Sequence, residues 1–509
     1  RPNIVLILAD DLGWGDLKVL NPDSKIAPPA CDRLAAEGCC FTEAHSPSDV
    51  CSPTRYGILT GRYAWRSKLK RGVLGGLSPR LIEPGRMTLA SMLKEQGYST
   101  CCVGKWHLGM NWKILPGKEV TELNIETRDQ VWNVDYSHPI VQGPLSVGFD
   151  RYFGISASLD MVPYTFIEND RVTLLPSEDR EFPLIIDHPE KGMIRKGPTA
   201  PGFDPRQVLP ELTRAAVAEI NSQAPAARAG KPFFLYFPLP SPHTPTAPSD
   251  EWRGKSGLNT YADYVMQSDH TVGAILDALS SNGLDDNTLV CFTSDNGPSP
   301  LAQLDELRGK GHLAAAHWRG HKADIYEGGH RIPLLVRWPG KIPAGSRSEQ
   351  LVSLTDFAAT FADILGLKLS DNAAEDSYSF LPAALGKPGS PRQDLISHSI
   401  NGSFAYREKN WKLLLCPGSG GWSFPRPGKD DTSEDPQFQL YDLSTDPQES
   451  RNLQPGYDLL VNHLLGMFVD QVQHGRSTPG SHQQNTTPVD IWLAGREAHR
   501  PLKTNLKPK

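Results

Sequence analysis

Short apolar runs alternate along the chain with segments whose apolar residues recur at helical spacing. Residues 4–8 form an apolar run of strand length that ends before Asp10, and residues 88–96 have a helical pattern that Gly97 stops. The same criteria predict further strands at 99–103, 232–237, 288–293 and 334–338, and helices at 209–223, 261–281 and 355–365. This strand–helix–strand rhythm favours an α/β fold with a large, mostly parallel central sheet sandwiched by helices.

The pattern changes after about residue 385. Runs at 403–407, 411–416 and 438–443 are typical of strands joined by turns, and they are followed by one helical segment at 458–472 and a polar, Pro- and Gly-rich tail. We therefore expect two domains: a catalytic domain over residues 1–385, and a smaller C-terminal α+β domain over residues 386–509 with an antiparallel sheet, one helix and an extended tail.

Composition narrows the class of protein. The 509 residues carry 52 basic and 58 acidic side chains, a net charge of −6, which disfavours a general nucleic-acid binder. The early apolar run is far shorter than the ~20 residues of a membrane span, so no transmembrane segment is predicted. The eight cysteines contain no CxxC pair, which disfavours structural zinc. Because the chain begins at Arg1, we interpret it as processed, with a signal peptide removed.

Polar side chains follow several of the predicted strands. Ligands of parallel sheets gather beyond the carboxyl ends of the strands, so this shared position is a functional signal. The residues concerned are Asp10, Asp11, Lys105, His107, His243, Asp295 and Asn296. Asp10-Asp11 and Asp295-Asn296 together offer three carboxylates and one amide, which are oxygen ligands suited to Ca²⁺ or Mg²⁺. Taken alone, Asp10-Asp11 is more typical of a helix N-cap or a solvated turn, and Asp295-Asn296 of a tight turn.

Cys51-Ser52-Pro53-Thr54-Arg55 is a sharper signal. Cys51 precedes a short helical run, and a thiol near a helix N-terminus is expected to have a lowered pKa. Arg55, one turn further on, is a candidate ligand for an oxyanion. Lys105 and His107 would point the same way in an extended segment. The alternative for Cys51 is a structural cysteine, and for Lys105, His107, His243 and Lys322, each taken alone, an ordinary surface side chain.

The Cys51–Arg55 segment, followed by Leu59-Thr60-Gly61, resembles the C-x-P-x-R maturation motif of the type I, formylglycine-dependent sulfatases of the alkaline phosphatase superfamily. Other segments resemble further motifs of that family in the right order, so that the resemblance covers roughly residues 2–453. They are Asp10-Asp11, residues 97–107, Pro242-His243, residues 294–297, Lys322 with residues 327–333, and residues 440–453. Asp49 departs from the pattern, because the family usually has a small residue there.

The resemblance implies that a maturation enzyme oxidises Cys51 to formylglycine, which is then hydrated to a geminal diol. It also implies a divalent cation, Ca²⁺ with Mg²⁺ as the alternative, bound by Asp10, Asp11, residue 51 (Cys51), Asp295 and Asn296. Arg55, Lys105 and Lys322 would neutralise the sulfate group while the diol attacks sulfur, helped by Asp295. His243 or Lys322 would protonate the leaving alcohol, and His107 would deprotonate the second hydroxyl so that sulfate leaves.

The expected activity is hydrolysis of sulfate monoesters, with a sulfated, glycosaminoglycan-like carbohydrate as substrate. Arg55, Lys105, His243 and Lys322 are the candidate sulfate-binding side chains, and His312, His317 and Arg319 are candidates for a polar wall around the sugar, with a solvated loop as the alternative. Two other functions remain open: a phosphonate monoester or phosphodiester hydrolase of the same superfamily, and a non-catalytic carbohydrate-binding relative. The family implies a periplasmic, extracellular or lysosomal location.

Overall fold

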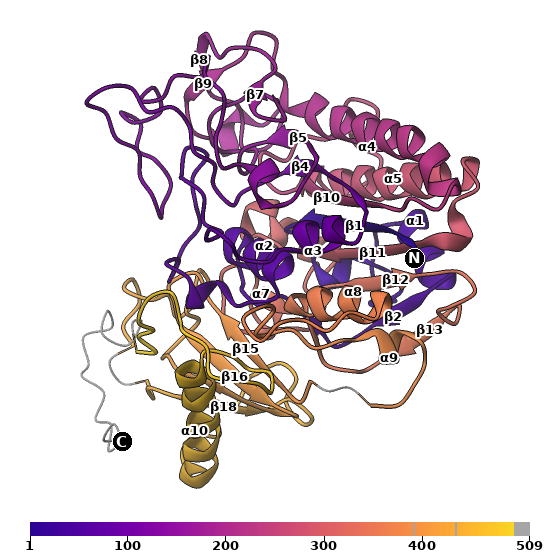
Figure 1. Cartoon of the computed structure of the whole chain (residues 1–509). Helices are drawn as coiled ribbons and strands as arrows, with labels where there is room; N and C mark the ends of the chain where they lie inside the picture. Colours follow the sequence, from indigo (N-terminus) through magenta and orange to yellow (C-terminus); the bar gives the residue numbers. More distant parts are fainter. Residues whose placement is uncertain (390–391, 433–434, 493–509) are drawn as a thin grey trace.

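The computed structural model describes residues 1–389, 392–432 and 435–492. Its central layer is a ten-stranded sheet in the order β13-β2-β12-β11-β1-β10-β4-β5-β6-β7 (Figure 1). The strands are β1 (Asn3–Asp10), β2 (Cys39–Phe41), β4 (Ser99–Lys105), β5 (Arg151–Ile155), β6 (Ile167–Glu168), β7 (Arg171–Val172), β10 (Phe233–Pro242), β11 (Thr288–Ser294), β12 (Leu334–Arg337) and β13 (Ser346–Ser348). The middle of the sheet, from β11 through β1, β10 and β4 to β5, is parallel, as expected from the sequence.

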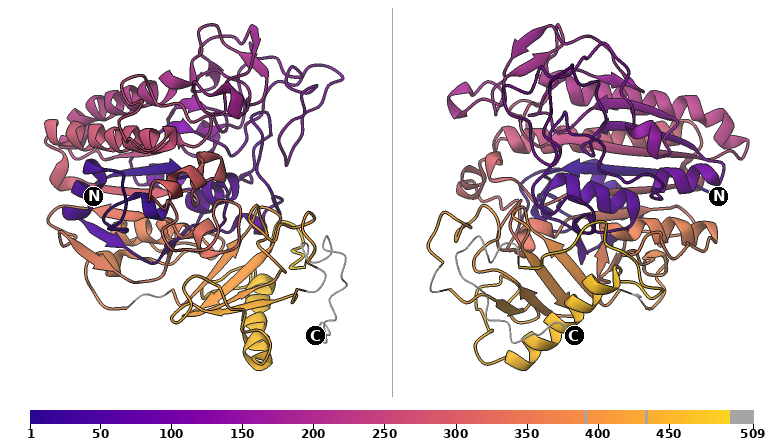
Figure 2. Two further views of the ribbon diagram at one scale, coloured as in Figure 1. Left: turned by 180° about the vertical axis from the view of Figure 1, so that it is seen from behind. Right: turned by 60° about the vertical axis from the view of Figure 1, so that its left-hand side comes forward.

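Helices cover both faces of this sheet (Figures 1 and 2). One face packs against α1 (Pro29–Ala36), α4 (Pro205–Arg228) and α5 (Thr260–Ser281). The other packs against α2 (Cys51–Thr60), α3 (Leu89–Glu95), α8 (Phe357–Leu365) and α9 (Leu381–Ala384). The two further short helices are α6 (Leu304–Gly309) and α7 (Glu327–His330).

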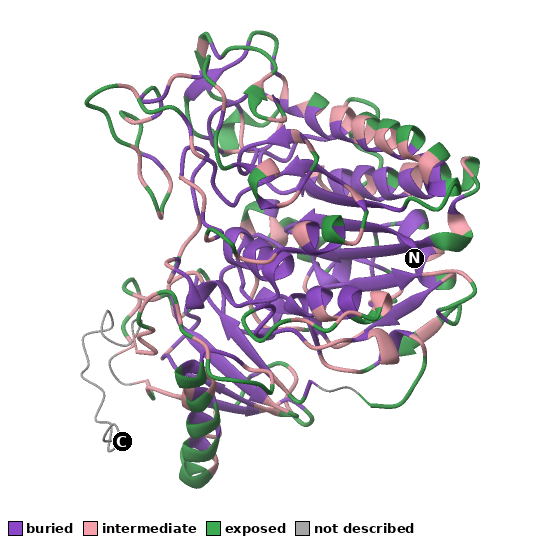
Figure 3. Ribbon diagram, in the orientation of Figure 1, coloured by how far each residue is buried: buried purple, intermediate pink, exposed green. Residues whose placement is uncertain are grey.

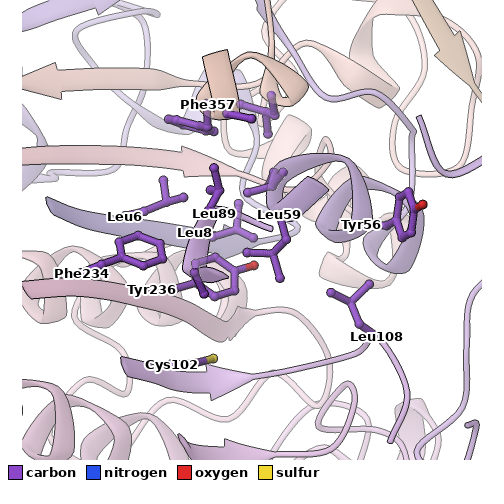
Figure 4. Packing of buried hydrophobic residues seen from close by; sticks show 14 of the residues in the cluster. Leu6, Leu8, Tyr56, Leu59, Leu89, Cys102, Leu108, Phe234, Tyr236 and Phe357 are labelled. Atoms are coloured by element: carbon purple, nitrogen blue, oxygen red, sulfur yellow. The ribbon is translucent and has the colours of Figure 1, made fainter. Parts of the chain in front are cut away.

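Strand β1 shows why the sheet needs helices on both sides. All eight of its residues are buried. Side chains alternate between the faces, so Leu6 and Leu8 join one core while Val5 and Ile7 join the other. Figure 4 shows Leu6 and Leu8 packed with aromatic side chains of β10 and with Leu59 of α2. Each such leucine contributes about 1.5–3 kcal/mol by burial, so the strand is anchored strongly in the layer. Figure 3 shows the same burial in the central strands of the sheet.

The chain departs from the parallel arrangement at β12, which runs antiparallel to β11. Because β11 ends and β12 begins at the same edge of the sheet, the intervening residues 295–333 remain at the carboxyl edge. Lys322 and Asp295 are therefore kept on one side of the molecule. β2 also pairs with β12 antiparallel, and β5, β6 and β7 form an antiparallel edge. The sequence pattern contains no signal for strands as short as β2.

The C-terminal residues form a separate antiparallel sheet, β15-β16-β17-β18. Its strands are β15 (Asp394–His398), β16 (Phe404–Glu408), β17 (Trp411–Leu414) and β18 (Gln439–Asp442), and α10 (Asp458–His474) packs on the sheet. β15 was not expected from the sequence pattern. Two small two-stranded sheets complete the structure, β3 (Ala44–His45) with β14 (Val352–Ser353), and β8 (Glu178–Arg180) with β9 (Gly197–Thr199). A search of the described residues for a helix able to cross a membrane finds none. The expected tail lies partly beyond the described residues.

Candidate active site

The carboxyl ends of β1 and β11 bring four of the predicted site residues together. These strands are parallel neighbours, and Ala9 pairs with Ser294 just before both sets of polar residues. The backbone N–H of Asp11 donates to Asp295 Oδ1 at 3.3 Å, and Asn296 Nδ2 donates to Asp11 Oδ1 at 2.7 Å. Asp11 has a left-handed backbone (φ 66°), which turns the chain as it leaves β1. The oxygen-rich site expected from the sequence is therefore present as one buried cluster.

Cys51 is the first residue of α2 and faces this cluster. Its Sγ lies 3.6 Å from Asp10 Oδ1 and 3.6 Å from Lys322 Nζ. Burial raises the pKa of the thiol to about 12, and the nearby lysines that lower it do not compensate. The lowered pKa expected from the helix N-terminus is therefore wrong, because desolvation and the neighbouring carboxylates outweigh it. As a neutral thiol, unmodified Cys51 is a weak nucleophile.

Three buried cations surround the same carboxylates. Arg55, one turn along α2, donates to Asp295 Oδ2 through Nε at 3.1 Å and Nη2 at 2.8 Å. Lys105, the last residue of β4, pairs with Asp10, and Lys322 Nζ lies 2.6 Å from Asp11 Oδ1. The cations that the sequence analysis predicted therefore come from three separate parts of the chain. Such a group can neutralise an anionic substrate in a site of low dielectric.

The pKa values of the Asp10 and Asp295 carboxylates are shifted in opposite directions. Burial alone would raise the pKa of Asp10, but Lys105, His243 and Arg55 lower it, and the net result is a pKa below its usual value. Asp295 has a raised pKa because it is buried and lies close to the Asp10 charge. Asp10 therefore stays ionised, and Asp295 is the carboxylate better able to accept a proton.

His107 lies at the base of the site in a left-handed conformation (φ 58°). The segment is therefore not extended there, and His107 and Lys105 do not project in parallel as expected. His107 Nε2 donates to the carbonyl of Leu74 at 2.8 Å, while Nδ1 is buried with no hydrogen-bond partner among the described residues. Burial, and then the Lys105 and Arg55 charges, hold the pKa of His107 well below its usual value. The ring is therefore neutral, with Nδ1 able to accept a proton.

His243 follows β10 and closes the other side. Its Nδ1 donates to the Thr244 carbonyl, which leaves Nε2 facing Asp11 Oδ2 at 3.7 Å. His243 and Lys322 are 7% and 5% exposed, whereas Asp10, Arg55, Lys105 and His107 are fully buried. These two side chains therefore mark the side from which a substrate would enter.

The donor set fits a hard divalent cation. Ligand atoms of Asp10, Asp11, Cys51 and His243 lie within 4.8 Å of one another. Asn296 Oδ1 is buried and, within the described part of the chain, accepts no hydrogen bond. A buried amide oxygen without a donor is unfavourable unless a ligand satisfies it, and oxygen atoms of this kind are what Ca²⁺ binds. His243, assigned to catalysis from the sequence, also belongs to this group.

Sequence reasoning missed two hydroxyl residues, Ser156 and Ser158. Both are buried, and neither side chain has a hydrogen-bond partner in the described residues. The backbone carbonyl of Ser156 accepts from His107 N at 2.9 Å, so this segment borders the site. Their position just after β5 is the same signal that identified the other residues, but serines are too common after strands for it to single them out.

The three residues predicted to form a sugar-binding wall differ in their surroundings. His312 is fully buried, its Nε2 donates to Asp16 Oδ1 at 2.8 Å, and its Nδ1 accepts from Lys25 N at 3.2 Å. Both ring nitrogens are thus engaged in holding the loop after β1. His317 is exposed and stacks on Trp318, with ring centroids 4.1 Å apart. Arg319 is half-buried at the wall of a cavity of about 580 Å³.

Known proteins resemble this chain over most of its length. The family model described as Sulfatase matches residues 2–367. The chain is 34% identical over 500 residues to an N-acetylgalactosamine-6-O-sulfatase of Bacteroides thetaiotaomicron, with 91% of this chain and 92% of that protein covered. It is 32% identical to human arylsulfatase A, covering 89% and 84% of the two chains. A solved structure from work on glycosaminoglycan metabolism by Bacteroides thetaiotaomicron superposes with a TM-score of 0.79 at 32% identity, covering 92% and 99%.

Proposed function

The chain belongs to the sulfatase family, as a type I member of the alkaline phosphatase superfamily, and we propose that it releases sulfate from a 6-O-sulfated N-acetylgalactosamine unit of a glycosaminoglycan-like carbohydrate. The substrate is suggested by the relative that shares 34% of its residues with this chain over nearly the full length of both. The reaction is the hydrolysis of a sulfate monoester by a sulfuric ester hydrolase.

One observation carries this proposal: Cys51 lies at a helix N-terminus within 3.6 Å of both a carboxylate oxygen and a lysine ammonium. Burial leaves the thiol protonated, so the cysteine itself is unsuited to attack sulfur. Oxidation of Cys51 to formylglycine removes this difficulty, because the hydrated aldehyde presents two hydroxyl groups at the same place. The maturation enzyme that carries out this oxidation is the partner we propose.

Asp10, Asp11, residue 51, Asp295 and Asn296 would hold the divalent cation, Ca²⁺ or alternatively Mg²⁺, because both ions bind oxygen donors. The bound ion supplies Lewis-acid polarisation of the sulfate oxygens. Arg55, Lys105 and Lys322 bring positive charge from the protein side and orient the sulfate group. Removing one such fixed donor typically lowers turnover by about 10²–10³-fold.

Proton transfers are assigned from the protonation states of the site. Asp295, with its raised pKa, is positioned to take the proton of the attacking hydroxyl. His243 and Lys322 lie at the solvent side, where the leaving alcohol emerges, and either can protonate it. Neutral His107 accepts the proton of the second hydroxyl through Nδ1.

The sugar would contact side chains beyond these. Arg319 and His317 are accessible and remain proposed substrate contacts. We propose that His312 acts indirectly, by holding Asp16. We also propose that the enzyme works in the periplasm, outside the cell or in the lysosome, after removal of a signal peptide.

The decisive test combines mass analysis with a rate measurement. The peptide that contains residue 51 should be about 18 Da lighter than its cysteine form. The same preparation should release sulfate from 6-O-sulfated N-acetylgalactosamine and act more slowly on an aryl phosphonate than on an aryl sulfate. An active preparation that contains only unmodified Cys51 would overturn the mechanism, and a faster reaction on the phosphonate would favour the phosphonate hydrolase function.

A further inference from the structure

A cavity of about 580 Å³ is lined by segments that adjoin the catalytic cluster along the chain. Its wall includes Pro300, four residues after Asn296, and His321, which immediately precedes Lys322. Lys322 N donates to the Pro298 carbonyl at 2.9 Å. This hydrogen bond connects the segment that contains Pro300 to the segment that contains His321, next to the catalytic lysine. The opposite side is closed by Ser423 of the C-terminal domain. This volume is typical of sites for small molecules, and its position suits the part of a substrate that extends beyond the sulfated sugar.

Arg319 is fixed in the wall of this cavity by partners that carry no charge. Its Nη1 donates to the Glu449 backbone carbonyl at 2.6 Å and approaches the Tyr441 hydroxyl at 3.4 Å. The guanidinium carbon lies 3.8 Å from the centre of the Tyr326 ring. Both tyrosine hydroxyls donate to Gln439 Oε1, at 2.8 and 3.0 Å, so the platform that holds Arg319 is itself ordered.

The Arg319 charge helps to lower the pKa of a nearby carboxylate, Asp446, but the two side chains do not form an ion pair. Among the residues described, no acidic side chain forms an ion pair with it, and its Nε and Nη2 donate no hydrogen bond to the protein. The acidic residues of the same cavity are engaged elsewhere: Asp305 pairs with Arg308 at 2.7 Å, and Glu306 pairs with Lys310 at 3.1 Å. A guanidinium held by neutral groups, with donors to spare, is suited to bind an oxyanion through two parallel hydrogen bonds.

We infer that this cavity is a subsite for the sugar unit next to the sulfated one, and that Arg319 recognises an anionic substituent on that unit, a carboxylate or a second sulfate. The inference rests on the proposed function, because it assumes that the sulfate ester is bound at the Cys51 cluster. It gives the C-terminal domain a direct part in recognition, because Glu449, Tyr441 and Ser423 belong to that domain.

The test compares substrates that differ only in the neighbouring unit. The first is 6-O-sulfated N-acetylgalactosamine linked to a hexuronate, the second has the carboxylate reduced to an alcohol, and the third carries a sulfate ester in place of the carboxylate. The wild type should prefer an anionic form over the alcohol by about 10- to 100-fold in kcat/KM, as expected for one charge-assisted hydrogen-bonded pair. Comparison of the first and third substrates shows which anion is recognised.

Arg319→Gln should reduce that preference to within about twofold of unity, and Arg319→Lys should restore part of it because the charge is kept. Arg426→Gln is the matched control: Arg426 lies near Ser423, is exposed and pairs with Asp430 at 2.9 Å. This control should keep the wild-type preference, and thermal melting should show that all three variants are folded. A wild type without preference for an anion, or an Arg319→Gln variant that keeps the preference, would overturn the inference.

A binding measurement separates this inference from the proposed function. The sulfate-free disaccharide that contains the hexuronate should bind about tenfold more weakly, by calorimetry, to Arg319→Gln than to the wild type. If that difference appears while no sulfate ester is hydrolysed, the subsite stands and the proposed function fails. If sulfate is released but Arg319→Gln changes neither binding nor turnover, the proposed subsite is wrong and the proposed function stands.

Discussion

Tyr261→Phe tests whether the loop after β1 is held in shape for a metal ion. The Tyr261 hydroxyl lies on α5 between Asp16 Oδ2, at 2.5 Å, and the backbone carbonyl of Asp11, at 3.1 Å. Gly13 N also donates to Asp16 Oδ2 at 2.8 Å, and His312 donates to the other Asp16 oxygen. These contacts support Asp11 in its left-handed conformation, which costs an ordinary residue about 1–2 kcal/mol.

The variant removes one hydrogen bond to a charged acceptor, so we expect the free energy of unfolding to fall by about 2 kcal/mol. Changes to groups that orient a metal ligand typically weaken binding by about 10- to 100-fold. We expect the lower end, about tenfold or 1.4 kcal/mol, because Asp16 keeps its bonds to Gly13 and His312. The assay is calorimetric titration of Ca²⁺ into metal-free wild type and variant, with unfolding followed separately in urea.

Tyr378→Phe is the control, because it also removes one hydroxyl, the donor to the Ser477 carbonyl at 2.7 Å, but away from the site. It should cost about 1 kcal/mol of stability and leave Ca²⁺ affinity unchanged. If Tyr261→Phe loses stability but binds Ca²⁺ as tightly as the wild type, Tyr261 does not position Asp11, and the reasoning is refuted.

Four further predictions concern residue 51, Lys105, the bound cation and His398. Cys51→Ala should abolish sulfate release while the protein remains folded by circular dichroism; retained turnover would exclude a nucleophilic role for residue 51. Lys105→Ala should lower kcat/KM on an aryl sulfate by about 10²–10³-fold, because it removes a buried cation beside Asp10, and a loss below tenfold would contradict its role. Exhaustive chelation should lower activity, and added Ca²⁺ should restore it. Elemental analysis would check that the metal has been removed completely. Full activity of the metal-free protein would contradict the cation site. Burial, with a smaller effect of Lys70, lowers the pKa of His398 to about 3, so the unfolded chain takes up a proton near pH 6.5 while the folded protein does not. The free energy of unfolding should therefore fall as the pH decreases from 6.5 towards 3. In urea unfolding, His398→Phe should reduce this pH dependence by about 1.4 kcal/mol per pH unit. An unchanged slope in the variant would contradict the assignment.

Much of the parallel core and of the catalytic cluster could be predicted from the sequence, because both rest on local signals. The residues 4–8 run and the polar residues that follow it are visible in one stretch, and parallel neighbours necessarily align their carboxyl ends. The direction of β12 could not be predicted, since a strand of four residues with only three apolar ones looks the same in either orientation. Helix α4 extends to 205–228, beyond the predicted 209–223, because Asp204 caps it and Pro205 occupies its first turn.

The errors at the site have a common physical cause. Helix position suggested a low pKa for Cys51, but the thiol is fully buried, and the cost of placing a charge there depends on tertiary packing. The orientation of His107 depended on a left-handed turn at a residue that is not glycine. The surroundings of His312 depended on Asp16, almost 300 residues earlier in the chain. Each of these properties arises from contacts between distant segments, which residue spacing does not encode.

A buried polar network joins the C-terminal sheet to helix α7. Lys412 of β17 donates to Glu327 at 3.0 Å and to His330 Nε2 at 2.9 Å, and it forms an ion pair with Glu449 at 2.8 Å. A lysine has three N–H donors and no acceptor, so His330 must carry its proton on Nδ1, which then donates to His45 Nδ1 at 3.0 Å.

This fixed pattern of donors argues against a second metal centre at His45, Glu327 and His330, although their ligand atoms lie close enough together for one. The lone pairs that a metal would need are already bonded to Lys412 and to each other, and Arg331 pairs with Glu327 at 2.8 Å. Breaking such a buried ion pair typically costs about 3–5 kcal/mol. Because Glu327 is only five residues from Lys322, the same network also holds the segment that contains Lys322. Replacement of Lys412 should therefore destabilise the contact between the two domains and the conformation of the segment that contains Lys322.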